Sequence, residues 1–338
     1  MLARIILGII GLAALVTLVV LAWPQAFGLE HLQGVAQLVA FRAALAAGAV
    51  VLAVLLLFGM LVARRLRRFL GFLTVVLLLF AGGNAAVLAS RGFSPGSGHA
   101  GTTPVAAEAD VVVLSWNTLG GAVDARTIAA LALRLGADVV TLPETTAETA
   151  TAVAGLMATA GRPMWAQTAS HGSYPGNSTS ILVSAALGEY AAIDRFGDTS
   201  IPPSLVVAPV NGEGPTLAAV HPVAPTPGNL DDWRNDLAFV DTLCSTPNTI
   251  VAGDFNATLD HLGGDPADAG DAGCTDAALV GGTAAVGTWP AWLPALVGTQ
   301  IDHVLATTGW KVVSAEVIQT EDDAGSDHRP ITATLTRS

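Results

Sequence analysis

The stretch Ile250-Val-Ala-Gly-Asp-Phe-Asn-Ala-Thr-Leu259 carries the most specific chemical pattern in the chain. The apolar residues 249–252 predict a short buried strand that ends at Gly253. Asp254 and Asn256 follow, and an extended chain would point both side chains to the same side. A carboxylate beside a carboxamide suits a hard cation, a phosphate oxygen or an attacking water. An Asx turn explains the same residues without any functional site.

Polar residues also lie at the ends of other apolar runs, and each run predicts a strand. Turn chemistry explains one such residue easily and a whole set of them poorly, so a shared site is the better interpretation. Six strand ends carry these residues: Asn117, Glu144, His221, Asp254 with Asn256, Asp302, and Asp327 with His328.

The strands alternate with helices in some places and with hairpins in others. Helical periodicity predicts helices over 124–135, 145–160 and 231–243, with Asp124 and Gly136 as the caps of the first. This mixture predicts two mainly antiparallel sheets packed face to face with helices outside. The expected strands are 110–117, 137–144, 180–184, 205–209, 216–220, 249–252, 299–305, 311–319 and 331–335, with a polar loop over 170–179 and an acidic, Gly-rich loop over 260–276.

Residues 1–90 are almost entirely apolar and contain three stretches long enough to span a bilayer, at about 5–23, 43–62 and 69–89. Four arginines between the second and third stretches (Arg64, Arg65, Arg67 and Arg68) place that loop in the cytoplasm, and Arg4 places the N-terminus there too. Everything after residue 90 is then extracytoplasmic, beginning with a flexible linker at 91–107. A cleaved signal peptide is the alternative for the first stretch.

The remainder of the chain is strongly acidic. Residues 91–338 hold 9 Lys and Arg and 26 Asp and Glu, so their net charge is 9 − 26 = −17. A domain this acidic lacks the positive surface typical of proteins that bind long nucleic acids, although a bound divalent metal would locally reverse the sign. Cys244 and Cys274 both fall here, and an even count outside the cytoplasm favours a disulfide over two buried thiols.

Residues 108–338 resemble the endonuclease/exonuclease/phosphatase superfamily, which has the DNase I-like fold. The resemblance rests on motifs in family order: Ser-Trp-Asn117, Leu-Pro-Glu144, His221-Pro-Val-Ala-Pro, Gly-Asp254-Phe-Asn256-Ala, Ile-Asp302-His303-Val and Ser-Asp327-His328-Arg-Pro. It implies a four-layer α/β sandwich and cleavage of a phosphate ester with Mg²⁺ or Mn²⁺. Many members have Gln where this chain has Pro143, which weakens the transfer of any one member's substrate.

The resemblance also implies a role for each motif residue. Asn117, Glu144 and Asp327 resemble the metal-binding residues. Asp254 resembles the group that orients or deprotonates the attacking water, and Asn256 the group that holds the phosphate. His328 resembles the phosphate-contacting or acid/base histidine with Asp302 as its partner, and His221 the histidine that stabilises the transition state.

Other candidates have plainer interpretations. His303 lies on the strand face opposite Asp302 and is expected to be structural. His171 and His261 are expected in loops, open to solvent, and Arg234 on a helix surface, with contact to the substrate as the alternative for each. Trp289 and Trp292 are expected to form a lid or core packing, with contact to a membrane surface as the alternative.

These observations favour a membrane-anchored, extracytoplasmic, metal-dependent phosphoesterase. Its expected partners are the lipid bilayer and a phosphate-ester substrate, which could be a phospholipid, a small phosphodiester or a nucleic acid. No obligate protein partner is indicated. The alternatives are an extracellular nuclease and a non-catalytic, membrane-anchored binding domain, while transport by the three apolar stretches is disfavoured because they contain no acid or base within their spans.

Overall fold

The computed structural model describes residues 1–94, 110–263 and 273–338. Most of the linker expected at 91–107, and the middle of the acidic loop expected at 260–276, lie outside the described residues. The chain divides into two compact units, Met1–Arg91 and Gly92–Ser338.

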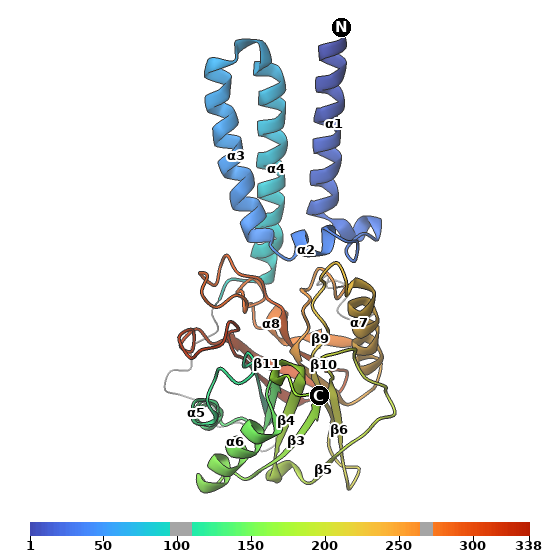
Figure 1. Ribbon diagram of the computed structural model, residues 1–338, viewed down its shortest axis with the longest axis vertical. Coiled ribbons are helices and arrows are strands. Elements are labelled where there is room, and N and C mark those ends of the chain that lie inside the picture. The colour runs from blue at the N-terminus through green and yellow to red at the C-terminus, as the bar shows by residue number, and fades with distance from the viewer. Residues whose placement is uncertain (95–109, 264–272) are drawn as a thin grey trace. The chain divides into compact units, whose positions relative to one another are not determined.

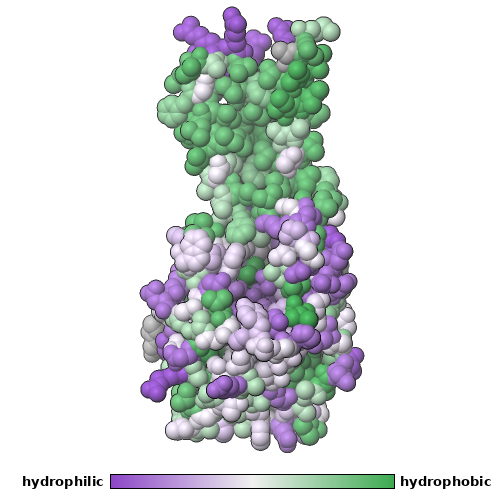
Figure 2. Space-filling view, in the orientation of Figure 1, coloured by the Kyte–Doolittle hydropathy of each residue, from purple (hydrophilic) through white to green (hydrophobic). Residues whose placement is uncertain are grey.

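The first unit consists of three long apolar helices and short connections (Figure 1). Each helix is long and apolar enough to cross a membrane, and hydrophobic surface runs along them (Figure 2). Arg42 is the first residue of the second long helix, where it is buried and donates to Asn84 Oδ1 over 2.7 Å. The elements are α1 (Leu2–Ala22), η1 (Pro24–Phe27), α2 (Val35–Val39), α3 (Arg42–Val62), η2 (Arg64–Leu66) and α4 (Arg67–Arg91).

The second unit contains two six-stranded sheets. In each sheet one pair of strands is parallel (β1 with β2, and β7 with β8), and the other pairs are antiparallel. The first sheet has the order β11 (Trp310–Val317), β12 (Ile331–Arg337), β1 (Asp110–Ser115), β2 (Val139–Pro143), β4 (Ser178–Ser184), β3 (Met164–Ser170). The second has the order β5 (Tyr190–Ala192), β6 (Leu205–Pro209), β7 (Thr216–Val220), β8 (Thr249–Asp254), β10 (Asp302–Thr307), β9 (Cys274–Asp276).

Side-chain alternation along the strands makes the layers. Val111 and Val113 of β1 lie in the core between the sheets, together with Ile250 of β8. Leu114 points the other way, into a core shared with the helices α5 (Ala125–Leu135) and α6 (Ala147–Thr159). The helix α7 (Leu230–Cys244) packs beside β8 and β10 of the second sheet. The remaining helices are short: η3 (Pro175–Asn177), η4 (Ala185–Leu187) and α8 (Ala277–Val280). The predicted sandwich is confirmed.

The helix boundaries follow the predicted caps. Asp124 accepts hydrogen bonds from the amides of Arg126 and Thr127, and Gly136 ends α5 with a left-handed φ of 67°. Three strands were missing from the prediction: β3, β5 and β9. They are edge strands: two are only three residues long, and β3 is mostly half-buried, so none offers a long, fully buried apolar run. The loop predicted over 170–179 overlaps both neighbouring strands, because β3 ends at Ser170 and β4 begins at Ser178.

Gly253 does not end its strand, because β8 continues to Asp254. A Cβ atom at Gly253 would overlap the main chain of Val220 on the neighbouring strand β7. Glycine is therefore required here by the close approach of two backbones rather than by a turn. The close approach of the two strands places His221, which follows the last residue of β7, near Asp254.

The predicted disulfide is present. Cys244, the last residue of α7, is joined to Cys274, the first residue of β9, across a sequence separation of 30 residues. The bond fixes the end of a peripheral helix to the edge of the second sheet.

Candidate active site

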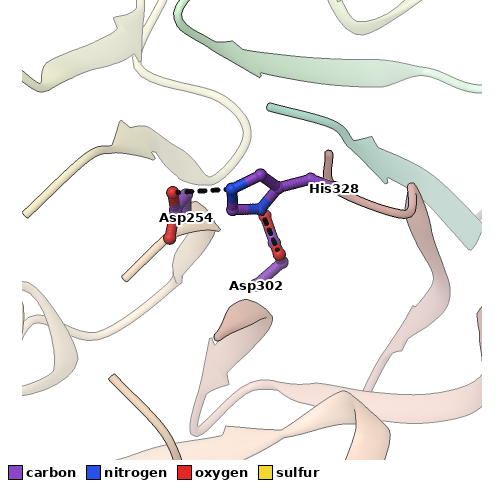
Figure 3. A group of neighbouring side chains, drawn as sticks. All are labelled: Asp254, Asp302 and His328. Atoms are coloured by element: carbon purple, nitrogen blue, oxygen red, sulfur yellow. Dashed lines mark hydrogen bonds and ion pairs between the residues drawn. The ribbon is translucent and has the colours of Figure 1, made fainter. Parts of the chain in front are cut away.

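Polar residues from both sheets meet at one end of the sandwich. In the antiparallel pair β8–β10, Asp254 lies directly opposite Asp302, which brings two motif carboxylates together. His328 reaches the same point from the loop before β12, and its ring lies between Asp254 and Asp302 (Figure 3). Hydrogen bonds, ion pairs and, for His221, a 3.8 Å approach to Asp254 connect all eight predicted site residues into one network: Asn117, Glu144, His221, Asp254, Asn256, Asp302, Asp327 and His328.

Asn117 is the bridge between the sheets. Its buried side-chain amide nitrogen lies 3.0 Å from Glu144 Oε1 and 3.0 Å from Asp254 Oδ2, and it donates to both. Its amide oxygen accepts from the backbone N–H of Leu119, also over 3.0 Å. The side chain is thus held by its oxygen and orients two carboxylates by its nitrogen.

Glu144 follows directly after β2, at a residue with a positive φ of 55°. Its other oxygen faces Gly176, where a Cβ atom would lie 3.1 Å from Oε2 and 2.6 Å from the ring of Tyr174. Burial raises the pKa of Glu144, and the charges of Asp254 and Asp327 raise it further against the opposing hydrogen bond from Asn117. A carboxyl in this environment gains from a bound cation.

Asp254 is the last residue of β8, but the chain does not stay extended as far as Asn256, so the Asx turn is the alternative that holds. Asn256 has a φ of 46°, and its backbone N–H donates to Asp254 Oδ1 over 2.8 Å. This Asx turn leaves Asp254 Oδ2 facing Asn117, while the Asn256 side chain donates to the carbonyl of Pro222. Burial raises the pKa of Asp254. The Asx turn at Asp254 is therefore part of the candidate site.

His328 and Asp302 form a buried pair. His328 Nδ1 lies 2.9 Å from Asp302 Oδ2, and Nε2 lies 3.7 Å from Asp254 Oδ2. Burial lowers the pKa of His328, but the charges of Asp302 and Asp254 outweigh it and raise the pKa to about 10. The imidazole is then a cation at neutral pH.

His221 has the opposite character. Its Nε2 lies 3.8 Å from Asp254 Oδ2, and burial lowers its pKa to about 4 although Asp254 opposes the shift. Its Nδ1 is buried and forms no hydrogen bond with the described residues. Asp254 therefore lies between one neutral and one charged imidazole, an arrangement that separates hydrogen-bonding and acid roles.

Asp327, the last of the eight residues, is supported by the indole of Trp289. Trp289 Nε1 donates to Asp327 Oδ2 over 2.9 Å, while Oδ1 lies 3.9 Å from His328 Nε2 and is buried without a hydrogen-bond partner among the described residues. Trp289 was not predicted to support this carboxylate. The role of its indole as a donor becomes visible only once the loop is folded.

A divalent metal fits the oxygen atoms of this network. Ligand atoms of Asp254, Asp302 and His328 lie within 4.8 Å of one another, but His328 Nδ1 and Asp302 Oδ2 are already hydrogen-bonded to each other over 2.9 Å. The oxygens of Glu144 and Asp327 are better suited, because Asp327 Oδ1 is unpartnered and Glu144 is held at an elevated pKa by other negative charges.

The other candidate histidines (His171, His261 and His303) and Arg234 lie outside this network. His303 is buried and bonded to Asp276 (2.6 Å) and to the carbonyl of Ala257, as its structural assignment predicts. His171 is exposed, but His261 is buried and accepts from Thr258, so its expected exposure was wrong. Arg234 pairs with Asp231 on α7.

Several supporting residues carried no functional signal in the sequence. Trp116 Nε1 donates to the carbonyl of His328, and Ser326 Oγ donates to that of Asn117. Thr118 and Thr145 share a 2.6 Å hydrogen bond beside Glu144. These contacts fix the backbone that positions the site.

Comparisons with known proteins agree with this geometry. Residues 114–328 match the profile of the Endonuclease/Exonuclease/phosphatase family. A structure of humanized D. rerio TDP2 carrying 14 mutations has 22% sequence identity and a TM-score of 0.50, covering 67% of this chain and 99% of that chain. D. rerio TDP2 complexed with a single strand DNA product has 19% identity and the same TM-score and coverage. These likenesses show the fold alone, and no curated protein matches the chain.

Proposed function

Because the chain belongs to the endonuclease/exonuclease/phosphatase family of metal-dependent phosphoesterases, we propose that it hydrolyses a phosphodiester or phosphomonoester outside the cytoplasm, anchored by its three apolar helices. The observation that carries this proposal is the bridge from Asn117 to Glu144 and to Asp254, 3.0 Å in each direction. The bridge joins Glu144, which would bind the cation, to Asp254, which would orient the attacking water.

Glu144 and Asp327 would hold the divalent metal, Mg²⁺ or Mn²⁺. Asn117 would lie beside the ion: its amide oxygen accepts one hydrogen bond from Leu119 and has a second lone pair for the metal, while its nitrogen orients Glu144. When bound, the ion would polarise the phosphoryl oxygens and offset the negative charge that develops on them. One or two carboxylates suffice for Mg²⁺, which retains several of its waters.

The other residues would act on the water and the phosphate. Asp254, whose pKa is raised by burial, would orient the attacking water and accept its proton. The charged His328, held by Asp302, would stabilise the phosphate and the transition state. Neutral His221 and the amide of Asn256 would contribute hydrogen bonds to the phosphoryl oxygens.

The substrate is proposed from charge and location. A net charge of −17 over residues 91–338 (9 − 26) disfavours long duplex nucleic acid, and an anchor in the membrane favours a phospholipid or another small phosphate ester near the surface. A nuclease is the second candidate, because the similar TDP2 structure contains a single strand DNA product.

A hydrolysis assay tests the activity. The purified full chain would be incubated with Mg²⁺ or Mn²⁺ and, separately, bis-p-nitrophenyl phosphate, p-nitrophenyl phosphate, DNA and phospholipid vesicles. Glu144→Ala and His328→Ala are the site variants, and Asp231→Ala on the surface of α7 is the control. Equal rates in all four proteins would exclude hydrolysis by this site, and a rate on DNA alone would favour the nuclease.

A reporter fusion tests the location. A reporter that is active only outside the cytoplasm would be fused after residue 100. We expect activity, since the arginines at 64–68 favour a cytoplasmic loop and three spans then export the rest. Activity instead from a reporter that works only in the cytoplasm would reverse the orientation.

A further inference from the structure

The loop of residues 290–298, called the Trp292 loop below, presents apolar side chains to its surroundings. Trp292 is 76% exposed, Leu296 54% and Val297 38%. Ala291 and Ala295 are buried and anchor the loop from beneath. All of the outward-facing residues are apolar, namely Trp292, Pro294, Leu296 and Val297.

The Trp292 loop lies within a long uncharged segment. Residues 277–301 contain no Asp, Glu, Lys, Arg or His, although residues 91–338 carry a net charge of 9 − 26 = −17. A surface that must stay in water usually interrupts apolar groups with charges. An exposed indole among aliphatic side chains is instead suited to the boundary between lipid headgroups and acyl chains.

The loop is held rigidly, so its exposed residues are not a frayed segment. The buried guanidinium of Arg329 donates to the carbonyls of Gly287 (3.0 Å), Ala291 (2.6 Å) and Leu293 (2.7 Å). The same guanidinium pairs with Asp322 over 2.8 Å. A scaffold of this kind presents Trp292 with little conformational entropy left to lose on binding.

The chain enters the second unit beside this segment. Ala285 donates its N–H to the carbonyl of Gly92, and Ser94 donates to that of Gly282, each over 3.0 Å. Gly92 is the residue that follows Arg91, the end of α4. The uncharged segment is therefore tied by hydrogen bonds to the residue covalently next to an apolar helix long enough to cross a membrane.

We propose that the Trp292 loop lies in the headgroup region of a lipid bilayer, with Trp292, Leu296 and Val297 in contact with lipid. The proposal rests on the membrane anchoring stated under the proposed function and does not depend on hydrolysis. Trp289, just before the loop, donates to Asp327, and Ala291 N donates to the Asp327 carbonyl. The lipid contact would therefore lie next to a carboxylate of the candidate site.

A position-specific probe tests the contact. Both native cysteines are paired, so Leu296→Cys in the full chain provides one thiol for the fluorophore NBD. Val210→Cys, at a residue that is 61% exposed in the turn after β6, is the matched control. Each protein would be reconstituted into phosphatidylcholine–phosphatidylglycerol vesicles, and flotation would first establish anchoring. Should Leu296→Cys fail to fold, Val297→Cys replaces it.

The expected result is a blue-shifted NBD spectrum at position 296 and quenching by nitroxide-labelled lipid at least about twofold stronger than at position 210. Quenching by aqueous iodide equal at the two positions would overturn the proposal. A blue shift without lipid quenching would overturn it too, because the loop would then be covered by protein. Failure to float would refute the anchoring itself, which is a separate outcome.

Discussion

His328 Nδ1 lies 2.9 Å from Asp302 Oδ2, and this buried pair has a counterpart outside the site, where His303 Nδ1 lies 2.6 Å from Asp276 Oδ2. Both pairs are charge-assisted hydrogen bonds between an imidazole and a carboxylate. Only the first contacts Asp254 through its other ring nitrogen. We propose a catalytic role for the first pair and a structural role for the second.

Replacement of Asp302 by Asn is expected to lower kcat by roughly 100-fold or more, because His328 loses the charge that keeps it protonated and oriented. Asp276→Asn is the matched control: it weakens an equivalent pair and is expected to leave kcat within about threefold of wild type. The rate of phosphodiester hydrolysis measures both. Equal losses in the two variants would assign Asp302 a structural role.

The sequence indicated which residues come together better than it indicated their individual contacts. Apolar runs that end in Asn117, Glu144 or Asp254 are local patterns, and such patterns can be recognised in a single sequence. The bridge from Asn117 to Asp254 spans 137 residues, and no periodicity records such a pairing. Asn256 could not be placed by strand geometry, because its positive φ depends on the turn that Asp254 caps.

The edge strands and the support of Asp327 were missed for related reasons. β9 has three residues and forms its strand only by pairing with β10, a contact distant in sequence. Trp289 reaches Asp327 from 38 residues away, so its role as a donor follows from the folded loop alone. Gly253 was interpreted as a strand terminator, since a glycine that admits a neighbouring backbone looks the same in sequence as one that permits a turn.

Metal binding is expected to weaken as the pH falls. Burial and the charges of Asp254 and Asp327 raise the pKa of Glu144, so the metal must displace a proton at a pH where an ordinary glutamate is already ionised. Calorimetric titration with Mn²⁺ in two buffers of different ionisation enthalpy would detect the released proton. Glu144→Gln is expected to lower the affinity at least about tenfold and to reduce proton release, while Asp231→Asn changes neither. Unchanged affinity in Glu144→Gln would remove Glu144 from the metal site.

The pair of His303 and Asp276 predicts a pH-dependent stability. Burial lowers the pKa of His303, but the charge of Asp276, its hydrogen bond and the hydrogen bond to the Ala257 carbonyl together outweigh it, so the folded pKa is above the ordinary value of 6.5. The pair's contribution is then fully present below about pH 6.5 and is lost as the pH rises through the folded pKa. The difference in melting temperature between wild type and Asp276→Asn should therefore shrink from pH 6 toward higher pH. A difference independent of pH would contradict this reasoning.

Gly253→Ala is expected to lower the free energy of unfolding by about 2 kcal/mol or more, because the added methyl overlaps the main chain of Val220. Gly155→Ala is the matched control, since it lies exposed in α6 with no atom near its Cβ position. There alanine should stabilise the helix by about 1 kcal/mol. Thermal unfolding of both variants measures the two effects, and a stable Gly253→Ala would show that β7 and β8 can move apart.

The disulfide between Cys244 and Cys274 reports on both location and stability. Outside the cytoplasm the pair should be oxidised, whereas a reducing cytoplasm would leave two thiols. Cells quenched with a maleimide reagent should therefore yield protein whose mass shifts only after reduction. Replacement of both cysteines by serine should cost about 2–4 kcal/mol of unfolding free energy, because the bond restricts the unfolded chain between α7 and β9. Maleimide addition without a reductant would place the second unit in the cytoplasm, and the hydrolysis proposed for it would then act on substrates of that compartment.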